Sequence, residues 1–529
     1  MGWRARPEAP PARDGPADAD IDLFITAAEA YPAFERVVLG ATREIVAGFR
    51  IFDFSTRLRS EQARSLGEDW FDLILHKLRE GVSFRLVLSD FDPIVATELH
   101  GLTWRSMRMA AALAELAGPD ARIEVTASLH PAAVGVVAKL ALWPRVHGLM
   151  DGRLREVQRK GDRSLSRFLA RHPHFASLLA RTGGRLRPRV WPLPSLWPVT
   201  HHQKTAVIDG EWLYIGGLDL NERRWDTPDH VERSEETWHD IQILVRDADR
   251  AAAVATHLGE LGDVIGGDRE ASDLDGRVLR TLSAKPKGRP SILAPNPVRR
   301  EIEAVLLAEI AQAERLIYIE TQYLRDRRIA RALAARAAAA PGLELMLILP
   351  AAPEDVAFQG TTRSDARFGE FLQASCIRKL RRAFRGRLFV GAPVQPEVAQ
   401  GGGRSVLHGA PMIYVHAKVC VIDARVAIVG SANLNGRSLR WDTELAIPLR
   451  DPATVRRLRD RCLRNWLGTD LTEDGALIDP DRTVRAWQRQ ALVNARAHPD
   501  ERVGFLVPYL TAPAKRFGRD LPAVPDEMV

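Results

Sequence analysis

The chain has 529 residues, of which 46% are hydrophobic and 27% charged, and its 75 basic and 68 acidic side chains give a net charge of +7. These proportions are typical of a globular protein and exclude a collagen-like or largely disordered chain. The three cysteines are widely spaced and form no C-x-x-C pair, which argues against a disulfide framework or a zinc ribbon. The basic excess fits anionic partners such as phosphate esters, nucleic acid or anionic lipid, without choosing among them.

The beginning of the chain predicts a disordered tail over residues 1–24, because Ala, Pro, Arg and Asp dominate it and it lacks the apolar core of a secretory signal. The most apolar stretch, residues 131–144, is interrupted by Lys139 and is shorter than the roughly 20 residues that span a bilayer. We expect a cytoplasmic protein that can visit a membrane surface. Export independent of a Sec signal fits the same sequence.

Hydrophobic periodicity then predicts alternating helices and strands. A helix starting near residue 34 leads into a buried strand at 45–52, and a second strand covers 82–88. The order returns later as a helix at 301–315, a strand at 316–319, an Ala-rich helix from 329 and a strand at 343–349. This alternation predicts an α/β fold.

The chain contains an internal duplication. Residues 202–223 align without a gap to residues 416–437, and nine of the 22 pairs are identical. We therefore predict a first repeat over 25–265 with a helical insertion at about 100–188, a linker over 266–300, a second repeat over 301–470 and a tail over 471–529. In the tail we predict only a short helix, near 483–497.

Both repeats contain the pattern H-x-K-x4-D, formed by His202, Lys204 and Asp209 in the first and by His416, Lys418 and Asp423 in the second. Composition alone predicts roughly 0.02 such matches in the chain, so two in register are not accidental. On a strand, the histidine and lysine share one face. The aspartate belongs to the candidate catalytic set. It lies seven residues after the histidine, however, and would therefore point to the opposite face of the strand. We expect it to end the strand and to bind backbone or a neighbouring cation.

Two repeats packed about a pseudo-two-fold axis would bring both His-Lys pairs into one cleft. Such a site suits phosphoryl transfer, in which the lysines neutralise phosphoryl oxygens, one histidine attacks phosphorus and the other protonates the leaving oxygen. This chemistry needs no metal, and no cofactor is expected. The predicted supporting groups are a close backbone approach at Gly217, hydrogen-bond donors at the oxyanion, and carboxylates that orient the histidines: Gly217, Asn221, Ser431, Asn433, Asn435, Asp240 and Glu444.

These residues resemble the phospholipase D superfamily, whose signature is a duplicated H-x-K-x4-D followed by Gly-Ser/Gly-x-Asn. The first half, with His201-His202-Gln203-Lys204 and Arg224-Trp225-Asp226, is similar to eukaryotic-type phospholipases D. So is the second, with residues 317–323 and the motif from Tyr414 to Ser438. The resemblance covers about residues 25–470.

The resemblance implies two tandem phospholipase D-like repeats, each a mixed β-sheet flanked by helices and packed as a pseudo-two-fold dimer. It also implies a two-step reaction in which His202 forms a phosphohistidine and His416 acts as acid and then as base. The implied substrate is phosphatidylcholine or phosphatidylethanolamine, cleaved to phosphatidate and a free headgroup, with phosphatidyl transfer to other alcohols. Asp219 stands where the general pattern has Asn, and contact with an amine headgroup is one hypothesis for it.

Other functions remain open on the sequence alone. One is a phosphatidyltransferase of the cardiolipin-synthase type, another is a nuclease or phosphodiesterase on nucleic acid, and a third is a non-catalytic lipid-binding scaffold. We expect a phospholipid substrate at a membrane surface, no nucleic acid partner and a monomer, since a duplicated site needs no dimer. Residues 190–198 form either an apolar rim that dips into a lipid interface or a segment packed on the motif strand.

Overall fold

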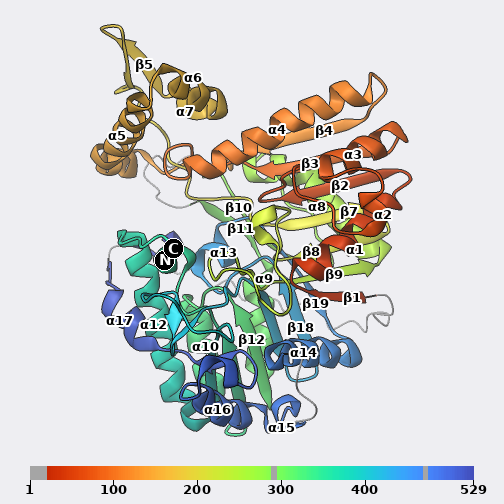
Figure 1. The fold of residues 1–529 in the computed structure, drawn as a ribbon, viewed down its shortest axis with the longest axis vertical. Helices are drawn as coiled ribbons and strands as arrows, with labels where there is room; N and C mark the ends of the chain where they lie inside the picture. The colour runs from red at the N-terminus through yellow and green to blue at the C-terminus, as the bar shows by residue number, and fades with distance from the viewer. Residues whose placement is uncertain (1–20, 287–294, 469–474, 523) are drawn as a thin grey trace.

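The computed structural model describes residues 21–286, 295–468, 475–522 and 524–529 (Figure 1). Most of the predicted N-terminal tail, residues 1–20, lies outside the described residues. Among the helices that are described, none has both the length and the apolar character needed to cross a membrane.

The first large sheet has seven strands in the order β1-β9-β8-β7-β2-β3-β4. Strands β2, β3 and β4 are parallel, and the other pairs are antiparallel. The bounds are β1 Ile21–Ile25, β2 Glu44–Phe49, β3 Ser83–Ser89, β4 Ile123–Ser128, β7 Lys204–Ile208, β8 Trp212–Gly216 and β9 Ile241–Arg246. We call residues 21–266 the first unit.

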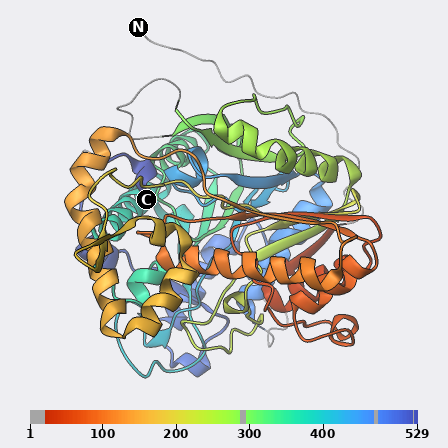
Figure 2. The same cartoon turned by 90° about the horizontal axis from the view of Figure 1, so that it is seen from above.

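Helices cover both faces of this sheet, with α8 on one face and α1, α3 and α4 on the other (Figure 2). Their sequences explain their ends and orientation. Asp69 and Asp247 cap α3 and α8 by accepting hydrogen bonds from backbone N–H groups, and α1 buries Ala27, Tyr31 and Phe34 at helical spacing. The helices are α1 Ala27–Leu39, α2 Glu61–Arg64, α3 Trp70–Arg79, α4 Thr97–Ala117 and α8 Ala248–Gly266, with a 3-10 turn at Glu222–Arg224.

The second large sheet has nine strands in the order β11-β10-β19-β18-β17-β12-β13-β14-β20. From β10 to β14 it repeats the strand order of the first sheet. The bounds are β10 Leu279–Ala284, β11 Asn296–Arg300, β12 Leu316–Thr321, β13 Glu344–Ile348, β14 Leu388–Pro393, β17 Lys418–Ile422, β18 Val426–Gly430, β19 Glu444–Leu449 and β20 Leu506–Pro508. We call the described residues from 279 onward the second unit.

The helices of the second unit include α9, α10 and α12, which follow β11, β12 and β13 as α1, α3 and α4 follow the strands of the first unit. The bounds are α9 Glu301–Gln312, α10 Arg327–Ala339, α11 Glu354–Ala357, α12 Ser364–Phe384, α13 Gly436–Arg440, α14 Pro452–Leu467, α15 Gly475–Ile478, α16 Thr483–Asn494 and α17 Thr511–Phe517, with 3-10 turns at Arg385–Arg387, Pro499–Glu501 and Asp526–Met528. A small ribbon pairs β15 Val406–Leu407 with β16 Ala410–Pro411.

Three stretches differ from the sequence prediction. The range 266–300, predicted as a linker, contains β10 and β11, which belong to the second sheet. The tail from 471, in which only one helix was predicted, contains α16 but also adds β20 to the sheet edge. The segment predicted as an insertion from about residue 100 includes α4 and β4, which belong to the first unit. The sequence of β4 is Ile-Glu-Val-Thr-Ala-Ser, and its alternating polar residues are not typical of a buried strand.

A helical lobe follows β4 and projects beyond the sheets at the upper left of Figure 1. It consists of α5 Val136–Arg159, α6 Asp162–Arg171, α7 Pro173–Ser177 and the hairpin of β5 Leu179–Thr182 with β6 Arg185–Pro188. The lobe has its own apolar cluster, which includes Val146, Met150, Leu154 and Phe175. Thirteen residues, 189–201, then lead from the lobe to His202.

The two large sheets share one buried apolar cluster, to which Val207 and Ile215 contribute from the first unit and Val421 and Ile447 from the second. Both sheets therefore rest on a common core.

Candidate active site

The two motif strands lie inside their sheets. Strand β7 pairs with β2 and β8, and β17 pairs with β12 and β18. Both strands are buried along their whole length, and a motif histidine stands two residues before each. These interior positions fix the backbone that carries each His-Lys pair.

Backbone hydrogen bonds between the units bring the two motifs together. The amide of His202 donates to the carbonyl of Thr443 at 2.8 Å, and the amide of His416 donates to the carbonyl of His239 at 2.7 Å. As a result, the imidazole rings of His202 and His416 are neighbours, with centroids 6.5 Å apart and planes inclined at 53°. The structure thus places both motif histidines in one site, as the duplication predicted.

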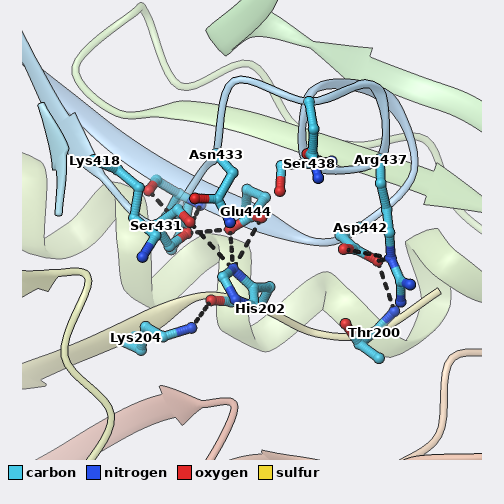
Figure 3. Close-up of polar contacts among 12 residues, drawn as sticks. Thr200, His202, Lys204, Lys418, Ser431, Asn433, Arg437, Ser438, Asp442 and Glu444 are labelled. Atoms are coloured by element: carbon cyan, nitrogen blue, oxygen red, sulfur yellow. Dashed lines mark hydrogen bonds and ion pairs between the residues drawn. The ribbon is translucent and has the colours of Figure 1, made fainter. Parts of the chain in front are cut away.

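The ring of His202 is held through one nitrogen (Figure 3). Its Nδ1 lies 3.0 Å from the Glu444 carboxylate and 3.1 Å from the carbonyl of Ser431. The hydroxyl of Ser431 donates to the same carboxylate. Since Nδ1 faces acceptors, it carries the hydrogen, and Nε2 is the nitrogen left for chemistry.

The ring of His416 is held in the same way by the other unit. Its Nδ1 lies 2.6 Å from Oδ2 of Asp240, and Trp238 packs on the ring with centroids 4.5 Å apart. The Nζ of Lys418 also lies 2.6 Å from this nitrogen, so Asp240 and Lys418 both contact Nδ1 of His416. Asp240 and Glu444, which we predicted as orienting carboxylates, each lie against the histidine of the opposite motif.

Burial controls the ionisation of the site. It lowers the pKa of both histidines well below the usual range, and the nearby Lys204 ammonium adds to the effect at His202, as Lys418 does at His416. Both imidazoles are therefore neutral in the unliganded protein. A bound phosphate would raise the pKa of the histidines again, since its negative charge favours the imidazolium.

The pKa values of the lysines and of the carboxylates are shifted toward each other. Burial lowers the pKa of Lys204 to about 8 and that of Lys418 to about 7. It raises the pKa of Asp240 to about 7 and that of Glu444 to about 8. Titratable groups with pKa values brought near neutrality are typical of catalytic sites.

Asp219 has a protein partner. Its Oδ1 lies 3.8 Å from Nζ of Lys204 and accepts a hydrogen bond from the amide of Ile51 at 3.0 Å. The side chain is buried. In this structure Asp219 thus holds the first motif lysine, a simpler role than the headgroup contact considered from the sequence.

The motif aspartates lie at the far ends of the motif strands, away from the histidines. Asp209 accepts hydrogen bonds from the amides of residues 42–44, and Asp423 accepts them from the amides of residues 314–316. Both have a φ of 54°, which ends the strand in a tight turn. Their inclusion in the catalytic set is therefore corrected: they anchor β2 and β12 beside the motif strands, as parity suggested.

The two motif asparagines also have local structural partners. Asn221 caps the 3-10 turn by accepting from the amide of Arg223, and Asn435 caps α13 by accepting from the amide of Ser438. Asn433 donates to Gln322 at 3.0 Å. Gly217 is required by packing, since a Cβ there would lie 2.0 Å from Oδ1 of Asp240.

Several residues at the site escaped the sequence analysis. The arginines 50, 224 and 437 surround the histidines with positive charge and help to lower their pKa. Arg224 stacks on Trp238 at 3.6 Å. The available signal was positional: Arg50 follows β2 directly and Gln322 follows β12 directly, so a polar residue succeeds the neighbour of each motif strand.

One group in the described part of the chain has the donor atoms for a metal ion. The side chains of Asp90, His100 and His174 bring ligand atoms within 4.8 Å of one another. None of these residues belongs to the two motifs.

Comparison with known proteins gives one family profile and several curated relatives. A family profile described as "Cardiolipin synthase, PLD-like domain" matches residues 306–466, which contain the second motif. Phospholipase D1 of Schizosaccharomyces pombe is 24% identical over 408 residues, covering 54% of this chain and 29% of that protein. Cardiolipin synthase of Listeria innocua is 22% identical over 305 residues, covering 55% of this chain and 54% of that protein.

The chain thus matches about half or less of the length of these curated relatives. Among solved structures, phosphatidylserine synthase of Haemophilus influenzae aligns with a TM-score of 0.48 at 15% identity, covering 90% of this chain and 94% of that one. The duplicated motif, the family profile and the named relatives together support membership of the chain in the phospholipase D superfamily.

Proposed function

We propose that this protein is a phospholipase D that hydrolyses phosphatidylcholine or phosphatidylethanolamine to phosphatidate and a free headgroup through a phosphohistidine. The observation that carries the proposal is the pair of neighbouring imidazoles, whose centroids are 6.5 Å apart and whose Nδ1 atoms are each held by a carboxylate. This arrangement leaves two Nε2 atoms for one phosphodiester.

In the first step, Nε2 of His202 attacks phosphorus and the bond from phosphorus to the headgroup oxygen breaks. The imidazolium of His416 gives its Nε2 proton to that oxygen, so the alcohol leaves neutral. Lys204 and Lys418 stabilise the charge on the phosphoryl oxygens, and Glu444 stabilises the positive charge that develops on His202.

In the second step, the neutral His416 takes a proton from water, whose oxygen attacks phosphorus as the bond to His202 breaks. Phosphatidate leaves and both histidines return to their starting state. An alcohol in place of water gives a new phosphatidyl ester by the same proton transfers.

A second candidate is phosphatidyl transfer to a lipid alcohol, as the names of the matched family profile and of the Listeria relative suggest. The same two steps apply, with the hydroxyl of a second phosphatidylglycerol as acceptor. The two candidates differ in the acceptor and not in the histidines.

We further propose that the two units are related by a pseudo-two-fold axis near the histidines. The repeated strand order supports this, and so do the paired contacts of His202 with Glu444 and of His416 with Asp240. A backbone superposition of the units in an experimental structure would test it; a rotation far from a half-turn would reject it.

The activity test supplies vesicles of phosphatidylcholine and phosphatidylethanolamine, with EDTA and ethanol present, and vesicles of phosphatidylglycerol in a parallel reaction. Hydrolysis predicts phosphatidate, free headgroup and phosphatidylethanol. Synthesis predicts cardiolipin and glycerol from phosphatidylglycerol.

The His202→Ala variant serves as the control in both reactions, and circular dichroism verifies that it is folded. Products that persist in this variant, or a nucleic acid substrate cleaved in place of lipid, would reject the proposal.

A further inference from the structure

The helical lobe and the segments that flank it, together residues 131–200, have a charge unlike that of the rest of the chain. It contains 13 basic and three acidic residues, a net charge of +10, whereas the whole chain carries +7. The remainder is therefore slightly acidic, at −3. Of the 13 basic side chains, 11 belong to exposed residues, so the lobe presents this charge to solvent.

The same lobe exposes large apolar side chains. Trp191 is 80% exposed and Val190 is 66% exposed, in the segment between the lobe hairpin and the first motif. On α5, Val137 and Leu140 are 63% and 59% exposed. Isolated exposed apolar residues are common, but an exposed tryptophan among several exposed aliphatic residues marks an interaction surface.

Hydrogen bonds join these two apolar stretches. The Nζ of Lys139 in α5 donates to the hydroxyl of Ser195 at 2.7 Å, and the amide of Val134 donates to the carbonyl of Leu196 at 2.9 Å. The start of α5 thus lies beside residues 195–196, a few residues after Val190 and Trp191. Of the two readings left open for residues 190–198, the exposure of the first residues favours the apolar rim, whereas Leu196 packs into the lobe core.

Helix α5 arranges its residues by type around and along its axis. Its buried positions, among them Met150, Leu154 and Val157, follow helical spacing and pack into the lobe core. Its exposed side begins with Val137 and Leu140 and ends with Arg155 and Arg159. The exposed side of α5 thus offers apolar contacts near its start and positive charge near its end.

We propose that the helical lobe docks the protein onto an anionic lipid bilayer, with Trp191, Val190, Val137 and Leu140 entering the interface and the exposed arginines of residues 131–200 binding lipid phosphates. Tryptophan favours the boundary between headgroups and acyl chains, and each basic residue near an anionic leaflet adds attraction. A nucleic acid would use the arginines but would leave the aliphatic residues exposed to water.

This inference rests on the proposed function, because the docked lobe would hold the site at the surface that contains its substrate. Only 13 residues separate β6 from His202, so a docked lobe and the first motif share one short connection.

The test measures cosedimentation with phosphatidylcholine vesicles and with equimolar phosphatidylcholine and phosphatidylglycerol vesicles. All binding variants are made in a His202→Ala chain, so that turnover does not alter the lipid. The His202→Ala chain with an unmodified lobe should bind the anionic vesicles more tightly than the phosphatidylcholine vesicles. High salt should release it from the anionic vesicles. Reversal of two charges with R185E and R187E should weaken binding by about 25-fold or more, and Trp191→Asp by about tenfold or more.

Matched controls lie on α16, at the other end of the molecule in Figure 1. Val493→Asp replaces a residue that is 59% exposed, and Arg489→Glu reverses an exposed charge. Both should bind vesicles like the parent. In the catalytically intact chain, the lobe variants should lose activity on anionic vesicles and keep it on a short-chain, monomeric phospholipid.

The outcomes separate the two proposals. Lobe variants that bind vesicles as well as the α16 controls overturn the docking surface, as does equal binding to neutral and anionic vesicles. Binding of a single-stranded oligonucleotide that depends on the lobe, without vesicle binding, also overturns it. A chain that binds anionic vesicles through the lobe but cleaves neither substrate supports the surface and rejects the proposed function.

Discussion

Nδ1 of His416 lies 2.6 Å from Oδ2 of Asp240, a residue 176 positions earlier in the chain. The contact between His202 and Glu444 joins residues 242 positions apart. Each motif histidine is thus oriented by a carboxylate of the opposite unit. A carboxylate that fixes the tautomer of a histidine without touching substrate is a positioning group.

The two histidines should be separable with an activated substrate. The His416→Ala variant should release one equivalent of p-nitrophenol from a phosphatidyl p-nitrophenyl ester and then stop. A good leaving group needs no proton, but water attack on the phosphohistidine still needs the missing base. Rapid-quench kinetics would measure the burst.

The His202→Ala variant should give no burst with this ester. A burst in His202→Ala and none in His416→Ala would reverse the assignment of nucleophile and acid. Recovery of an acid-labile, alkali-stable phosphoryl group on the protein would identify the intermediate.

The carboxylates should matter for turnover more than for binding. Asp240→Asn and Glu444→Gln should each lower kcat by roughly 10- to 100-fold with a small change in KM, because they orient the histidines. Steady-state kinetics across a pH series should also show that the limbs of the kcat profile move along the pH axis. A purely structural loss would not move them.

Gly217→Ala offers an independent test of Asp240. Its new Cβ would collide with Oδ1 of Asp240, so the carboxylate must move away from His416. We expect a kcat similar to that of Asp240→Asn. Wild-type kcat in Gly217→Ala would contradict the role of Asp240.

The alkaline limb of kcat/KM should come from the lysines. Lys418 and Lys204, with pKa values lowered to about 7 and about 8, are protonated below these values and lose their positive charge as the pH rises through them. Substrate capture should therefore fall between about pH 7 and pH 8. The limb in kcat should lie at higher pH, because bound phosphate stabilises both ammonium groups. Coincident limbs would exclude this explanation.

The motif aspartates should affect stability and leave chemistry intact. Asp209→Ala and Asp423→Ala should each cost about 1–2 kcal/mol of unfolding free energy, since backbone amides lose their acceptor. Asn should restore part of the loss, as it accepts a hydrogen bond and tolerates positive φ. Thermal denaturation, paired with kcat of the folded enzyme, would decide; a kcat collapse without destabilisation would return the aspartates to the reaction.

The sequence predicted the α/β class from alternating helices and strands, the two motifs from their duplication, and the orienting carboxylates as polar residues that follow the motifs. It did not predict β10 and β11, whose residues pair only in the context of the second sheet, nor β4, whose polar alternation resembles a surface segment. Arg50 was missed because its position directly after β2 points to the site only once β2 is known to neighbour the motif strand. Its approach to His202 depends on sheet order, which is a tertiary property.

The exchange of carboxylates between the units has a consequence during synthesis. A ribosome-bound chain that has completed the first unit already contains His202 and Asp240, but the partner of each of these residues lies in the second unit. Glu444, at the start of β19, leaves the ribosome among the last of the site residues. Newly made protein thus assembles the paired-histidine site only after both units have docked, and a chain truncated before β19 lacks the carboxylate that holds His202.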